Sequence, residues 1–114
     1  MTSEGQVTTI EGSFVAIGPA AEISDGTYVI AEVGEHSVLV ANLGGEFCAV
    51  ENRCSHVGSP LEGGRLKRGR IACPLHGAVY NLRTGASLAG ALAPRGLTTF
   101  ATRLEDGVVS ALVG

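Results

Sequence analysis

Two short segments of the chain each carry one cysteine and one histidine. Cys54 and His56 form the first pair, and after a spacer of sixteen residues Cys73 and His76 form the second. Thiolates and imidazoles bind transition metals, so each segment could hold a metal from one loop. A zinc finger usually pairs cysteine with cysteine and histidine with histidine. One of each in both loops instead suits a two-iron cluster, in which one iron binds both cysteines and the other both histidines.

Other chemistries remain open at this point. A mononuclear zinc site with two cysteines and two histidines uses the same four ligands. Two core cysteines and two surface histidines could also fall into this spacing by coincidence. A nucleophilic cysteine–histidine pair lacks a third, orienting group. The Cys-x-x-Cys-His motif of c-type haem attachment is missing from the sequence.

The residues around both pairs carry a resemblance to a known family. Residues 54–58 (Cys-Ser-His-Val-Gly) and 73–77 (Cys-Pro-Leu-His-Gly) resemble the two cluster loops of Rieske proteins. Residues 78–85 are similar to the strand and turn that follow the second loop, and residues 91–94 resemble the proline-containing loop that covers the cluster. The resemblance implies one Rieske-type [2Fe–2S] cluster. Cysteines would hold its buried iron and histidines its exposed iron, the four ligands being Cys54, Cys73, His56 and His76.

The histidine ligands have a physical consequence for such a cluster. Replacing two thiolates by neutral imidazoles removes two negative charges, so adding an electron costs less free energy. The reduction potential therefore rises from roughly −400 mV in plant-type clusters to a window of about −150 to +300 mV.

The resemblance also separates kinds of Rieske protein. High-potential members of the cytochrome bc complexes carry a further cysteine in each loop, joined as a disulfide, and this chain has Ser59 and Leu75 there. It is more similar to the soluble ferredoxins of bacterial ring-hydroxylating dioxygenases. That resemblance implies an electron carrier for aromatic hydrocarbon catabolism, not an enzyme in itself. It would take electrons from a flavin-dependent ferredoxin reductase and pass them singly to a terminal oxygenase. The alternative is the small Rieske subunit of an assimilatory NADH-dependent nitrite reductase.

Size and composition predict a single small domain over residues 1–114. The apolar share of 45% and the charged share of 17% fit a compact chain with its own core. The formal net charge of −3 gives no support to binding of nucleic acid or an anionic membrane surface. No run of eighteen apolar residues exists, and residues 1–6 lack the basic and apolar regions of a secretory signal. We therefore expect a cytoplasmic protein that is monomeric in solution.

Short β-rich runs separated by turn residues predict an all-β fold, a small antiparallel sandwich or barrel. The expected strands lie at residues 14–17, 27–33, 37–42, 46–51, 70–72, 79–81, 98–104 and 108–113. The dipeptide Asp106-Gly107 is the clearest hairpin signal. Residues 52–94 contain both ligand pairs and little sustained alternation, so we interpret them as a loop-rich cluster-binding subdomain inserted between strands. Residues 1–50 and 97–114 are expected to pair, which brings both termini to one end.

Further features outside the ligand pairs have predicted roles. Cys48 lies in an alternating run and is expected to be a small buried hydrophobe. His36 is expected at an exposed turn. The basic run of residues 65–70 is interpreted as a solvated loop, or as a surface that steers a redox partner electrostatically. The partner is expected to dock over the ligand histidines, with Val57 and Leu75 in the contact.

Two residues after the second ligand pair bear on the reduction potential. High-potential Rieske proteins place a serine directly after the second loop's His-Gly and a tyrosine two residues later, and their hydroxyls bond cluster sulfurs. Ala78 stands where the serine would be, whereas Tyr80 is kept. We expect Tyr80 to bond the Cys54 sulfur and the potential to lie near the low end of the Rieske window. The alternative is a packing role for Tyr80, with its hydroxyl in solvent.

Overall fold

Two antiparallel sheets form the framework of the protein. The computed structural model describes residues 13–54, 60–74, 77–88 and 95–113. The first sheet has the order β10-β11-β2 and the second the order β3-β4-β5-β9. Their bounds are β2 (Ser13–Pro19), β3 (Tyr28–Val33), β4 (His36–Leu43), β5 (Glu46–Glu51), β9 (Thr99–Phe100), β10 (Thr102–Glu105) and β11 (Val108–Val113). A single turn of 3-10 helix, η2 (Ala20–Glu22), follows β2.

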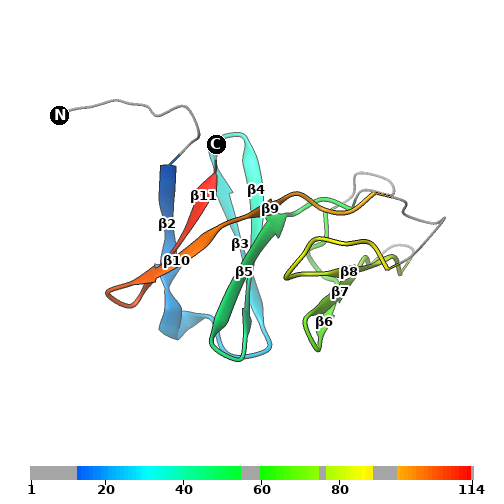
Figure 1. Ribbon diagram of the computed structural model, residues 1–114, viewed down its shortest axis with the longest axis horizontal. Helices are drawn as coiled ribbons and strands as arrows, with labels where there is room; N and C mark the ends of the chain where they lie inside the picture. Colours follow the sequence, from blue (N-terminus) through cyan, green and yellow to red (C-terminus); the bar gives the residue numbers. More distant parts are fainter. Residues whose placement is uncertain (1–12, 55–59, 75–76, 89–94, 114) are drawn as a thin grey trace.

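A third, smaller sheet lies beside this framework (Figure 1). It contains β6 (Arg65–Lys67), β7 (Arg70–Ala72) and β8 (Val79–Asn81), all antiparallel. All three strands fall between β5 and β9 in the sequence. The chain thus leaves the framework after β5, builds this small sheet, and returns at β9.

Strands β4 and β5 supply both cores, because successive side chains point to opposite faces of a strand. Val38 and Val40 pack with Ala49 and with side chains of β11 in the core between the two framework sheets. Leu39 and Ala41, on the other face, pack against the small sheet in a second core. The five central residues of β4 are therefore buried without the alternation of a half-exposed strand.

The predicted all-β fold is confirmed. The predicted strands at residues 46–51, 70–72, 79–81 and 108–113 have the observed bounds. Pairing of β2 with β11 and of β5 with β9 joins the two ends of the described chain, as expected, and Val113 lies opposite Ser13. Asp106 and Gly107 both have positive φ, 54° and 77°, between the paired residues Glu105 and Val108. That geometry is a two-residue hairpin turn.

Two strand predictions were wrong. The single strand expected at residues 98–104 is two strands, because Ala101 interrupts it between β9 and β10. The basic run at residues 65–70, interpreted as a loop, forms β6, a tight turn and the start of β7. Arg68 has φ of 54° in that turn and Gly69 has φ of 77°. An arginine in this conformation is uncommon, which is why the turn was not expected from the sequence.

Within the described residues, no helix is long and apolar enough to cross a bilayer.

Candidate metal centre

Both predicted cysteine ligands are buried in the second core, the one between the framework and the small sheet. Cys54 follows β5 and has no exposed surface, and Cys73 follows β7 and is 2% exposed. Both belong to one buried cluster that also contains Ala78 and Tyr80. Neither cysteine takes part in a disulfide. Two thiols from two separate loops are thus buried in one cluster, where a soft metal could bind them.

Tyr80 stands next to the first of these thiols. Its ring is fully buried on β8, opposite Ile71 of β7, and its hydroxyl oxygen lies 3.2 Å from the Sγ of Cys54. The predicted contact is therefore confirmed, and the alternative with the hydroxyl in solvent is wrong. A metal-bound thiolate has no hydrogen to give, so in that state the tyrosine donates. Ala78, also fully buried, offers no such donor.

Asn52 closes the base of the first loop, a role that sequence reasoning missed. Its Oδ1 accepts hydrogen bonds from the backbone N–H of Leu61, at 2.8 Å, and of Glu62, at 3.0 Å. Its Nδ2 donates to Ser37 Oγ at 3.1 Å. Because the side chain is only 8% exposed, these bonds are shielded from water. One amide thus joins the two ends of the segment that carries Cys54 and His56.

The second loop is closed by its own backbone. The N–H of Cys73 donates to the carbonyl of Ala78 at 2.7 Å, and the N–H of Gly77 donates to the carbonyl of Cys73 at 2.9 Å. Gly77 has φ of +74°, a conformation in which side chains other than glycine are strained. The hydrogen bonds of Cys73 and Gly77 thus bring the two ends of this loop together directly before β8.

Tyr28 ties the loop region to the framework. From β3, its hydroxyl accepts a hydrogen bond from Gly63 N–H and donates one to the carbonyl of Gly64, both at 2.9 Å. A Cβ on Gly64 would collide with the carbonyl oxygen of Ala72 and lie 2.8 Å from that of Leu61. Glycine at this position thus permits a close approach between the end of the first loop and β7.

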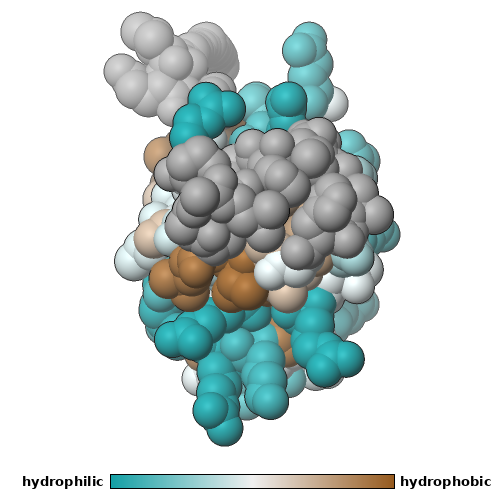
Figure 2. All heavy atoms as spheres, turned by 90° about the vertical axis from the view of Figure 1, so that its right-hand side faces the viewer, coloured by the Kyte–Doolittle hydropathy of each residue, from teal (hydrophilic) through white to brown (hydrophobic). Residues whose placement is uncertain are grey.

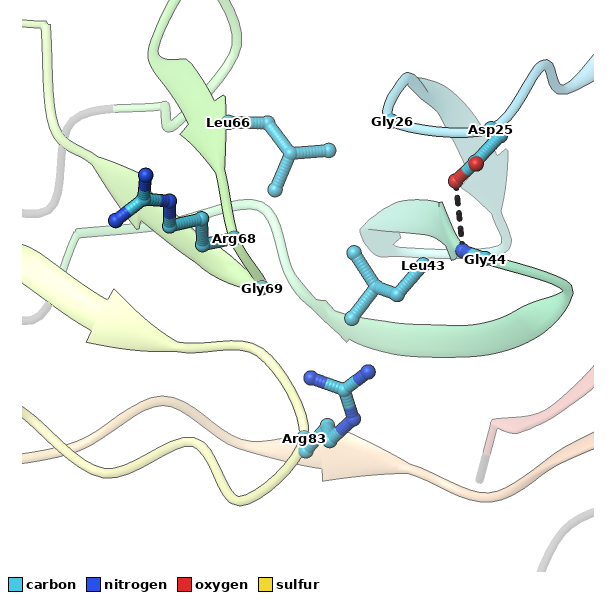
Figure 3. A pocket seen from close by; sticks show the side chains of 8 residues that line it. All are labelled: Asp25, Gly26, Leu43, Gly44, Leu66, Arg68, Gly69 and Arg83. Atoms are coloured by element: carbon cyan, nitrogen blue, oxygen red, sulfur yellow. Dashed lines mark hydrogen bonds between the residues drawn. The ribbon is translucent and has the colours of Figure 1, made fainter.

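A hollow lies at the joint between the framework and the small sheet (Figure 3). Leu43 and Leu66 point toward each other across it, while the Arg68 guanidinium points away. The Asp25 carboxylate accepts from Gly44 N–H at 2.7 Å. Arg83 donates to Glu46 at 2.9 Å, and this bond holds the pKa of Arg83 above its ordinary value. Asp25 and Arg83 thus already have partners within the chain, and Arg68 is directed out of the hollow.

The remaining predicted residues stand as follows. Cys48 is buried at 9% exposure, as expected; burial and then the charge of Glu46 raise the pKa of its thiol, and Arg83 offsets part of this. His36 is exposed at the start of β4, as expected. The predicted histidine ligands, His56 and His76, lie outside the described residues, as do Val57, Leu75 and the loop at residues 91–94. Among the described residues, no group of three or more potential ligands converges.

The sequence matches the Rieske [2Fe-2S] domain family over residues 13–101. The chain belongs to this family. Such a domain carries a Rieske [2Fe–2S] cluster, and the donor set here fits it, because two buried cysteines outside any disulfide and a hydroxyl beside one sulfur suit a thiolate-bound iron.

Relatives of known identity fall into several kinds of protein. The chain is 40% identical over 70 residues to apoptosis-inducing factor 3 of Homo sapiens, covering 61% of this chain and 12% of that protein. It is 34% identical over 95 residues to the cytochrome b6-f complex iron-sulfur subunit of Chlorobaculum tepidum, covering 83% of this chain and 51% of that one. It is 37% identical over 97 residues to the ferredoxin component of biphenyl 2,3-dioxygenase from Rhodococcus jostii RHA1, covering 83% and 89%. The chain thus spans only a part of the first two proteins, but most of the ferredoxin.

Solved structures give the same fold. A ferredoxin of Sphingomonas yanoikuyae B1 superposes with a TM-score of 0.81 at 26% identity, covering 90% of this chain and all of that one (100%). A complex of reduced oxygenase and oxidized ferredoxin in carbazole 1,9a-dioxygenase contains a chain with a TM-score of 0.81 at 27% identity, covering 87% and 92%. One of these neighbours is a ferredoxin, and the other belongs to a complex of an oxygenase with a ferredoxin.

Proposed function

We propose that this protein is a Rieske ferredoxin that carries single electrons from a flavin-dependent ferredoxin reductase to a terminal aromatic-ring-hydroxylating oxygenase. The observation that carries the proposal is that the chain matches a dioxygenase ferredoxin over most of its length as well as in sequence. The chain covers 89% of a dioxygenase ferredoxin that is 37% identical to it. A structural neighbour occurs in a complex with its oxygenase.

The four predicted ligands would each have a defined part. Cys54 and Cys73 would supply thiolates to one iron from the buried side, and His56 and His76 would supply imidazoles to the other. When bound, the cluster supplies reversible one-electron transfer in a potential window set by its ligands. Tyr80 would donate its hydroxyl hydrogen to the Cys54 sulfur, and Asn52 would hold the first loop closed. The buried side chains of the second core would exclude water from the thiolates.

The first test is the metal itself. Anaerobically purified protein is expected to be red-brown, with iron and acid-labile sulfide near two each per chain, whereas stoichiometric zinc without sulfide would contradict the cluster. Cys54→Ser and His76→Ala should each lose the cluster, because each removes a ligand. Cys48→Ser is the matched control, since this cysteine is not a predicted ligand and should leave the iron content unchanged.

The second test is electron transfer. Product formation from an aromatic substrate, with NADH, the ferredoxin reductase and the terminal oxygenase of the same organism, should depend on the amount of this protein added. Cys54→Ser protein should not replace it. Nitrite reduction that requires this chain, together with an oxygenase reaction that does not, would instead favour the nitrite reductase subunit.

The remaining predictions from the sequence are part of this proposal. We propose a single Rieske domain over residues 1–114, with the cluster-binding subdomain at about residues 52–94. The carrier would be a cytoplasmic monomer that binds neither nucleic acid nor membrane.

A further inference from the structure

The outer face of the small sheet is a basic groove. In the antiparallel register, Arg65 lies opposite Ala72, Lys67 opposite Arg70, and Ala72 opposite Val79. Paired residues share a face, so these side chains lie together, while Leu66, Ile71 and Tyr80 face the core. A surface groove is lined by the members of this face and by the turn residue; they are Arg65, Lys67, Arg68, Arg70, Ala72 and Val79. We call it the basic groove.

The surface around the small sheet combines apolar and hydrophilic areas. Figure 2 looks at the end of the molecule where β6, β7 and β8 lie, and it shows an apolar area bordered below by hydrophilic side chains. The basic groove likewise combines apolar and charged side chains, with two small apolar residues and four cations. Half of the eight lysines and arginines of the chain are in this one groove, although the formal net charge is −3.

Two features of the basic groove lower the stability of the folded protein. Lys67 and Arg70 are directly opposite each other on neighbouring strands, and like charges in that position destabilise a sheet. Arg68 takes a positive φ of 54°, where Asn or Gly would be favoured. Local choices that act against stability are expected where a surface serves binding.

The described part of the chain does not neutralise these cations by ion pairs. The ion pairs that it contains are Arg83–Glu46 and Arg103–Glu105, and neither includes a residue of the groove. The four side chains of Arg65, Lys67, Arg68 and Arg70 are all exposed. They can therefore attract a negatively charged surface without first giving up an internal partner.

The groove also adjoins the second ligand loop. Its two apolar residues, Ala72 and Val79, are paired with each other, and they precede Cys73 and follow Ala78 directly in the chain. The loop that carries Cys73 and His76 begins and ends at this pair. An occupant of the groove would lie one residue from a predicted ligand.

We propose that the basic groove is the docking site for an acidic patch on the electron-transfer partner protein. The proposal rests on the proposed function, because it names where the partner binds. A carboxylate-rich segment would sit between Arg65, Lys67 and Arg70, with apolar contact to Ala72 and Val79. The docked partner would lie beside the loop that carries Cys73 and His76, two of the predicted cluster ligands.

Electron transfer to a small anionic oxidant tests the groove. The probe is hexacyanoferrate(III), which takes one electron from the reduced protein and becomes hexacyanoferrate(II), followed by stopped-flow absorbance. If the net charge of the protein decided the rate, two negative reactants would repel, and the rate would rise with added salt. If instead the positive charge of the basic groove determines the rate, the rate should fall several-fold between about 10 and 200 mM NaCl.

Lys67→Glu should slow this reaction about tenfold at low salt. The fold should be kept, because the substitution turns a like-charge pair into a pair of opposite charges with Arg70. Arg103→Glu on β10 is the control with the same change in charge, and it should change the rate less than twofold. A wild-type rate that rises with salt, or equal effects of both variants, would overturn the proposal.

Direct binding supplies a readout independent of the cluster. Poly-L-glutamate, measured by isothermal titration calorimetry, should bind the wild-type protein at least tenfold more tightly than Lys67→Glu, and it should slow oxidation by hexacyanoferrate(III). A DNA duplex of about 20 base pairs that binds equally well would overturn the acidic-protein assignment in favour of a general polyanion site. Protein without iron and sulfide would refute the proposed function, whereas poly-L-glutamate binding would still report on the groove.

Discussion

Replacing Tyr80 by phenylalanine removes one atom from beside a predicted ligand and leaves the ring in place. The hydroxyl lies 3.2 Å from Cys54 Sγ, and both residues have no exposed surface. Water cannot take the place of the lost donor. The perturbation therefore removes the hydroxyl beside the Cys54 sulfur while it keeps the buried ring.

The expected effect is a lower reduction potential. A hydrogen bond to a charged group contributes roughly 1.5–3 kcal/mol, against about 0.5–1.5 kcal/mol between neutral groups. The reduced cluster is the more negative state, so the bond stabilises it more than the oxidised one. With a difference of about 1 kcal/mol, and 59 mV for each factor of ten in a one-electron equilibrium, the potential should fall by about 40 mV.

Protein-film voltammetry of both forms measures this change. Tyr28→Phe is the matched control, because the hydroxyl of the other tyrosine forms its two hydrogen bonds with the backbone of Gly63 and Gly64, not with a cysteine sulfur. Its midpoint potential should stay within a few millivolts of the wild-type value. An unchanged midpoint in Tyr80→Phe would leave the residue as packing. Because Ala78 offers no donor, the wild-type value should lie near the low end of the window, and a value near +300 mV would refute that reasoning.

Three further predictions concern the scaffold. Asn52→Ala should lower the free energy of unfolding by about 2–4 kcal/mol in urea titrations and speed the loss of iron to a chelator, because two backbone donors lose their acceptor. Asn42→Ala, which removes a similarly buried amide from the framework, should lower stability without speeding iron loss. Gly64→Ala should be destabilising in thermal unfolding because of the collision with Ala72, whereas Gly18→Ala, with open space around it, should stay within about 0.5 kcal/mol of wild type; equal midpoints would refute the close approach. Cys48 of the iron-loaded protein should react with iodoacetamide more slowly than a free cysteine, and its rate should keep rising above about pH 9, because the raised pKa leaves less thiolate at neutral pH. A rate that levels off near pH 8 would contradict this.

The framework could be predicted from the sequence because its strands alternate and its turns carry Asp-Gly and Gly-Gly signals. Strand β5 and strand β11 have the expected bounds for this reason. Strand β6 was missed because only Leu66 of its three residues is apolar, and because an arginine stands where a hairpin turn favours Asn or Gly. Its alternation of charged, apolar and charged residues was the available signal.

At the site, short motifs predicted the contacts that lie close to the ligands. The Tyr80–Cys54 contact followed from the place of the tyrosine after the second loop, and the structure has it. The role of Asn52 could not be inferred in the same way. Its backbone partners come nine and ten residues later, and an asparagine before a loop is ordinarily a turn residue.

The two faces of β4 pack into different cores, and this arrangement bears on how the protein is made in the cell. The two cores share this strand but have no buried side chain in common, and both predicted cysteine ligands belong to only one of them. The core between the framework sheets needs nothing from the ligand loops. A newly synthesised chain can therefore complete that half before iron arrives, and present the two loops on a formed support to the machinery that delivers the cluster.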